Sequence, residues 1–156
     1  MKTAAQLQAL VNQRAWDKEV LLWIGPEKAL IDALGSVRFR VLDLLDLFDV
    51  NNLPGDAEET KGYLRGRLQE HLKAIPRGSD DRSVLIVKSI GLLARYNVGL
   101  TVFYDWFIGS FALAILFLDG VADKTEWPED VRCDATRLVG YFSEPGMVKD
   151  VFSAME

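Results

Sequence analysis

The stretch SVLIVKSIGLLARYNVGLTVFYDWF, residues 83–107, decides the fold expected of this chain. Its four apolar residues at 84–87 indicate a strand that is buried on both faces. A turn at Gly91 and an aromatic helix over about 98–108 are expected to follow. The run FALAILFLD at 111–119 is apolar up to its last residue, and it predicts the central strand of a parallel sheet.

Strand and helix signals alternate along the rest of the chain. Further strands are expected at 19–25, about 39–43 and 137–142, and helices at 3–16, 27–35, about 57–74 and 145–155. Strands separated by helices imply parallel pairing through right-handed crossovers. We therefore predict a single three-layer α/β domain over residues 1–156, with a mostly parallel sheet of four or five strands.

Composition excludes several classes of protein. The chain has 156 residues, of which 49% are hydrophobic and 26% charged, as in an ordinary globular domain. Its net charge of −5 disfavours direct binding to nucleic acid. The single cysteine, Cys133, excludes an internal disulfide and fits a cytoplasmic protein.

One segment has the length of a membrane span. Residues 98–118 are mostly apolar, but Asp105 near the middle would cost about 2.5–3.5 kcal/mol in a bilayer. Gly109 and Ser110 divide the segment into an aromatic part and an apolar strand. A protein that does not enter the membrane is therefore expected.

The motifs of a phosphate-binding ATPase are incomplete. After the first long strand, GPEKALI at 25–31 offers one glycine, and Lys28 is followed by Ala29 where a magnesium-binding hydroxyl would stand. After the strand at 84–87 comes Lys88, where a magnesium-binding carboxylate is often found. The sequence thus indicates a P-loop NTPase-like scaffold without intact motifs, and we predict no catalytic residue, no cofactor and no metal.

Other reactive side chains have ordinary interpretations. Asp119 ends a strand beside Gly120, and we favour a turn over a metal ligand or a base. His71 is expected on the solvated face of its helix, and Cys133 is expected to be inert. A solvated face is also expected of the acids with i, i+3 spacing, Asp43, Asp46 and Asp49.

An excess of aromatic residues is the less ordinary feature. Phe103, Trp106 and Phe107 share one helical face and are expected in the core. Tyr, Trp and Arg are enriched at interface hot spots. On this basis we predict a partner interface that comprises Arg95, Tyr96, Tyr104 and Trp127.

The segments VLDLLDLF, VLIVKSIGLLARYNVGLTVFYDW and LAILFLDG, within residues 39–120, resemble the BrxB family of bacteriophage exclusion (BREX) gene clusters. In that family a strand leads into a Gly-containing turn, a leucine-rich segment with an arginine, and an apolar strand. Here these are Ile90-Gly91, residues 92–95 and residues 111–120. The family usually has Pro-Gly after its apolar strand, whereas this chain has Asp119-Gly120.

The resemblance implies a non-catalytic subunit of a cytoplasmic antiviral complex, whose partner is the alkaline-phosphatase-like PglZ protein. It implies no catalytic residue. Two alternatives remain open on the residues alone. The first is a small nucleotide-binding protein or NTPase-like enzyme with a non-standard phosphate site. The second is membrane association through residues 98–118.

Overall fold

The computed structural model describes residues 2–13, 19–49, 51–75, 84–96, 98–106, 113–118 and 139–142. Its strands are β1 (Lys2–Thr3), β2 (Glu19–Ile24), β3 (Phe39–Asp43), β4 (Val84–Lys88), β5 (Leu113–Leu118) and β6 (Val139–Phe142). Its helices are α1 (Ala4–Asn12), α2 (Glu27–Leu34), α3 (Leu44–Leu47), α4 (Ala57–Ala74), α5 (Gly91–Arg95) and α6 (Thr101–Trp106).

The strands form one sheet of six strands in the order β1-β6-β2-β5-β4-β3. Each strand runs parallel to its neighbours. The predicted α/β class is therefore confirmed. The strand that the sequence did not predict is β1, which has only two residues and pairs with β6 at the opposite edge from β3.

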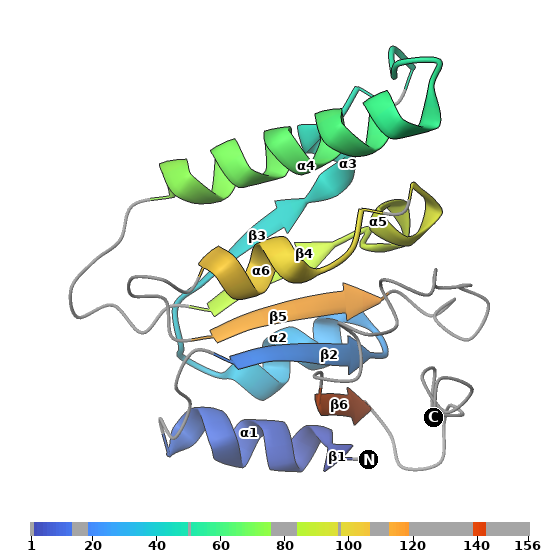
Figure 1. Ribbon diagram of the computed structural model, residues 1–156. Coiled ribbons are helices and arrows are strands. Elements are labelled where there is room, and N and C mark those ends of the chain that lie inside the picture. The colour runs from blue at the N-terminus through green and yellow to red at the C-terminus, as the bar shows by residue number, and fades with distance from the viewer. Residues whose placement is uncertain are drawn as a thin grey trace.

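Helices cover both faces of the sheet, with α2 behind it and α6 in front of it (Figure 1). Alternate residues of the central strands therefore enter two separate cores. The α4-side core contains Val20 and Leu22 of β2, Leu85 and Val87 of β4, and Leu64, Leu68 and Leu72 of α4. The α2-side core contains Leu21 and Trp23 of β2, Val84 and Ile86 of β4, Leu7 and Val11 of α1, and Leu30 and Leu34 of α2.

Helix α4 begins at a side-chain cap and buries one stripe. Asp56 accepts a hydrogen bond from the Glu58 N–H, which satisfies one of the free donors of the first turn. The stripe continues from Thr60 through three leucines with i, i+4 spacing. Tyr63 lies outside this stripe, one position before Leu64, and is 37% exposed. Thr60 is buried instead, and its hydroxyl lies within hydrogen-bonding distance of the Pro54 C=O.

Two expectations for the segment after β4 need correction. Gly91 does not make a separate turn but begins α5, and α6 begins at Thr101, three residues later than the expected start of the aromatic helix. Phe103 is fully buried in the α4-side core, as predicted. The predicted helix at 145–155, the side chain of Trp106 and the residues Phe107 and Cys133 lie outside what the structure describes.

Residues 98–118 do not form one continuous helix, because α6 lies in the first half and β5 in the second. In the parts of the chain that the structure describes, no helix is long and apolar enough to cross a membrane. Strand β5 lies between β2 and β4 and is hydrogen-bonded to both, which explains its continuous apolar sequence.

The end of α2 supplies a test of the fold. Gly35 closes α2 with φ +62° and ψ −124°, a conformation that residues with a Cβ rarely adopt. We expect Gly35→Ala to lower the free energy of unfolding by about 1–3 kcal/mol. Gly62 lies inside α4 with free space where a Cβ would stand, so Gly62→Ala should raise that free energy by about 0.5–1 kcal/mol.

Urea denaturation of both variants and the parent chain measures these free energies. Opposite signs for the two Gly→Ala changes are the expected result. If Gly35→Ala were as stable as the parent, the described end of α2 would be wrong.

Candidate functional site at the carboxyl edge of the sheet

The carboxyl ends of the parallel strands lie along one edge of the sheet. There α2 leaves β2 toward one face, and α5 leaves β4 toward the other face, with β5 between the two strands. Ligands of open α/β sheets bind at this edge, at the point where the strand connections reverse direction. The polar groups beside β5 are therefore the first place to look for chemistry.

The turn from β2 to α2 is short, and a hydrogen bond across it stabilises it. Trp23 is fully buried, and its indole N–H donates to the Pro26 C=O at 3.3 Å. Glu27 is the first residue of α2, where a carboxylate interacts favourably with the partial positive charge of the helix N-terminus. A phosphate group would occupy the same position in a nucleotide-binding protein. The carboxylate of Glu27 therefore disfavours an anion at this helix.

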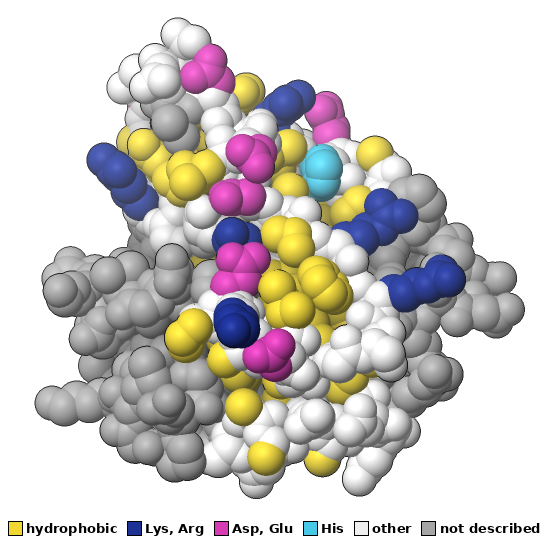
Figure 2. Space-filling view, turned by 180° about the vertical axis from the view of Figure 1, so that it is seen from behind, with side chains coloured by type: hydrophobic (Ala, Val, Ile, Leu, Met, Phe, Trp, Pro, Cys, Tyr) yellow, Lys and Arg dark blue, Asp and Glu magenta, His cyan; other side chains and the backbone are white. Residues whose placement is uncertain are grey.

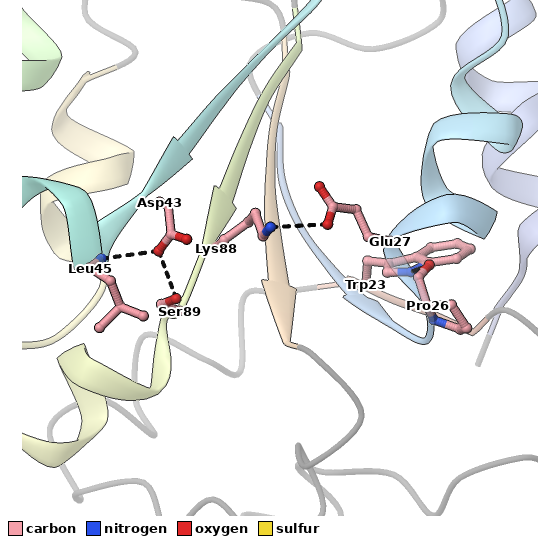
Figure 3. Close-up of polar contacts among 7 residues, drawn as sticks. All are labelled: Trp23, Pro26, Glu27, Asp43, Leu45, Lys88 and Ser89. Carbon is pink, nitrogen blue, oxygen red and sulfur yellow. Dashed lines mark hydrogen bonds and ion pairs between the residues drawn. The ribbon is translucent and has the colours of Figure 1, made fainter.

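An ion pair links this turn to the end of β4. The Lys88 ammonium lies 3.0 Å from the Glu27 carboxylate, and the two side chains are 28% and 37% exposed (Figure 3). The charges are reversed relative to a phosphate-binding ATPase, in which the helix carries the lysine and the strand carries the acid. Lys28, the lysine considered from the sequence, is exposed on α2.

Two more polar residues meet beside this pair. The Ser89 hydroxyl donates to Asp43 Oδ1 at 2.8 Å, and the same oxygen accepts the Leu45 N–H at 3.0 Å (Figure 3). Asp43 thereby caps α3 and joins the end of β3 to the end of β4. Ser89 has a φ of +65°, which costs a residue with a Cβ about 1–2 kcal/mol. A non-glycine residue with this conformation is most often found at turns and functional sites.

The acidic run beyond β3 has local structural roles. Asp49 accepts hydrogen bonds from the Asn51 N–H and the Asn52 side chain, and Asp46 is exposed. No group of three His, Cys, Asp or Glu side chains could hold a metal ion within the described segments.

The predicted partner interface is described only in part. Arg95 is exposed at the end of α5, and its guanidinium lies 5.7 Å from the centre of the Tyr96 ring. Tyr96 is half-buried and packs against the α4-side core. Tyr104 belongs to α6, but the structure does not describe its side chain. Trp127 lies outside the described residues. The structure thus brings Arg95 and Tyr96 together and places neither of the other two side chains.

Sequence reasoning missed a second exposed region. Phe39 and Val41 of β3 are 36% and 46% exposed, and Leu45 of α3 is 52% exposed. The alternation of Arg38 and Arg40 with these apolar residues was the available signal, because charged residues often protect edge strands.

We found no family model that matches the chain, and no curated protein or solved structure with significant similarity to it.

The ion pair can be measured by a double-mutant cycle. We expect Glu27→Gln and Lys88→Met to show a coupling free energy of about 0.3–1 kcal/mol, typical of a partly exposed pair. The coupling should decrease at high salt, because added ions screen charges near the surface. Urea denaturation of the parent, both single variants and the double variant gives the value. Zero coupling at low salt would mean that the two side chains do not interact.

Proposed function

We propose that the protein is a non-catalytic interaction subunit of a cytoplasmic multiprotein complex, built on a P-loop-type scaffold. The observation that carries this proposal is the Lys88–Glu27 pair, which neutralises two charges at the edge where an α/β enzyme holds its ligand. A phosphate at this edge would have to compete with the Glu27 carboxylate for both the lysine and the helix N-terminus.

The surface at the end of α5 supports the same proposal. An arginine beside a tyrosine that is anchored in the core is a pairing common at interface hot spots. Because one side of the Tyr96 ring is already packed, binding would order few additional rotamers, which lowers the entropic cost of association. We propose that Arg95 and Tyr96 contact the partner, together with Tyr104 and Trp127.

The resemblance of residues 39–120 to the BrxB family gives this proposal a specific partner. We propose a phage-defence complex of the BREX type, in which the chain binds a PglZ-type protein. Identification of the captured partner tests this assignment.

Charge reversal at Arg95 tests the interface. We expect Arg95→Glu to reduce recovery of the stoichiometric partner about tenfold or more, as for a hot-spot residue. The matched control is Lys28→Glu, the same charge change on a residue exposed on α2, against the opposite face of the sheet. Recovery is measured by gentle purification of the tagged chain from its own host, followed by mass spectrometry.

Equal recovery with both variants would contradict the proposed interface. A chain that is purified alone, as a monomer, would contradict the proposed function. A stoichiometric partner other than a PglZ-type protein would refute the defence assignment and leave the interaction subunit in place.

A second candidate function is nucleotide binding with a non-standard phosphate site. The observation in its favour is Ser89, whose strained backbone lies next to Lys88 and Asp43 at the carboxyl edge. Such strain is often kept at positions that bind a ligand.

Thermal unfolding with ATP or GTP and magnesium decides between the two functions. A ligand that binds the folded state at 100 times its Kd raises the free energy of unfolding by about 2.7 kcal/mol. We expect no change in Tm for the parent chain. A rise in Tm that is lost in Lys88→Met would establish the nucleotide function instead.

A further inference from the structure

We propose that the outer edge of β3 binds an extended strand of the partner, in which acidic residues alternate with apolar ones. This inference rests on the proposed interaction function and adds a second contact with its own chemistry. Three features of β3 carry it: the direction of its backbone groups, the exposure of one side-chain row and the charge of the other.

The backbone of β3 has one unpaired side. Among the described strands, β3 is the last of the sheet and pairs only with β4. The Val84 N–H donates to the Arg38 C=O at 3.0 Å, and the ladder pairs Phe39 with Val84. In a parallel ladder with this register, residues 38, 40 and 42 direct their N–H and C=O groups to β4. The corresponding groups of Phe39 and Val41 point away from the sheet, and no described residue hydrogen-bonds to them.

One row of side chains on β3 is apolar and exposed. Phe39 and Val41 lie next to Val84 and Ile86, which belong to the α2-side core, so all four side chains are on the same face of the sheet. Phe39 is 36% exposed and Val41 is 46% exposed. The space-filling view from behind, the side on which α2 lies, shows hydrophobic side chains gathered in the middle of this face (Figure 2). An added strand with apolar residues on this face would cover them.

The other row on β3 is basic. Arg40 is exposed and lies on the α4 side of the sheet, as does Arg38, because side chains two positions apart share a face. The chain as a whole has a net charge of −5, so this edge reverses the sign that prevails elsewhere. Acidic residues on the same face of an added strand would lie next to the two arginines. Main-chain hydrogen bonds then supply affinity and the alternation supplies specificity.

A second copy of this chain fits the edge less well. An antiparallel pair of β3 strands centred on Val41 places Phe39 opposite Asp43 and Arg40 opposite Leu42 of the second copy, so charges face apolar groups. A pair centred on Arg40 places arginine opposite arginine, which is destabilising. The arginines thus disfavour self-pairing at this edge, as charges on edge strands generally do.

Hydrogen exchange of individual amides, measured by NMR, tests the proposal. In the free chain we expect the Phe39 and Val41 amides to exchange at least tenfold faster than those of Arg40 and Leu42. The probe is a synthetic eight-residue peptide that alternates valine with glutamate. It should slow exchange at Phe39 and Val41 at least tenfold, whereas a peptide that alternates valine with lysine should not.

Variants of the two rows locate the contact. We expect Val41→Lys and Arg40→Glu each to weaken binding of the glutamate peptide at least tenfold. The matched control is Leu45→Lys, which makes the same kind of change at an exposed apolar residue of α3 and should bind the peptide as the parent does. Circular dichroism confirms that each variant is folded.

Three outcomes would overturn the inference. Slow exchange of Phe39 and Val41 in the free chain would mean that the edge is already paired. Protection that rises with protein concentration alone would assign the edge to a second copy. Peptide binding that is unchanged in Val41→Lys would place the contact elsewhere.

The partner captured from the host separates this inference from the proposed function. A partner lost with Arg95→Glu but retained with Val41→Lys would overturn the strand addition and leave the interaction function in place. Recovery of no partner would refute the interaction function, while exchange at Phe39 and Val41 would still decide whether the edge is open to an added strand.

Discussion

Burial of β2 and β4 on both faces is the constraint on which the rest of the structure depends. A parallel strand in the middle of a sheet has no solvated face, so its successive side chains must enter two different cores. Val20 and Leu22 enter the α4-side core, whereas Leu21 and Trp23 enter the α2-side core. Each core requires helices of its own, so the chain must cross the sheet on both sides. Because the strands are parallel, Glu27 after β2, Lys88 at the end of β4 and Ser89 after it all lie at the same edge of the sheet.

The carboxyl edge and the outer edge of β3 differ in what they leave unsatisfied. At the carboxyl edge, Lys88 pairs with Glu27, and Asp43 accepts hydrogen bonds from Ser89 and from the α3 backbone, so these described polar groups are matched within the chain. Strand β3 instead presents outward backbone groups and two exposed apolar side chains. Binding free energy comes from groups that gain partners, and for this reason the proposed contacts lie at β3 and at the end of α5.

Patterns within one element were predictable from the sequence, and the arrangement of elements was less so. The apolar run of β5, the bounds of β3 and the bounds of α4 follow from local periodicity, turn residues and acidic starts. The exposure of Phe39 and Val41 depends on the position of β3 at the end of the sheet. Local sequence patterns do not predict the order of strands in a sheet. The Lys88–Glu27 pair joins residues 61 positions apart, so no spacing rule could find it. The contact of Arg95 with Tyr96 joins neighbours in the chain, and the role of the two residues at an interface stays a prediction.

The most direct test of the central claim is a map of amide chemical shifts in the isotope-labelled chain, recorded with the captured partner and separately with magnesium and ATP. We expect the partner to shift the amides of β3 and of the α5 end, and ATP to shift none at Glu27, Lys88 or Ser89. Saturable shifts at those three residues with magnesium and ATP would contradict an interaction subunit and would identify the carboxyl edge as a nucleotide site.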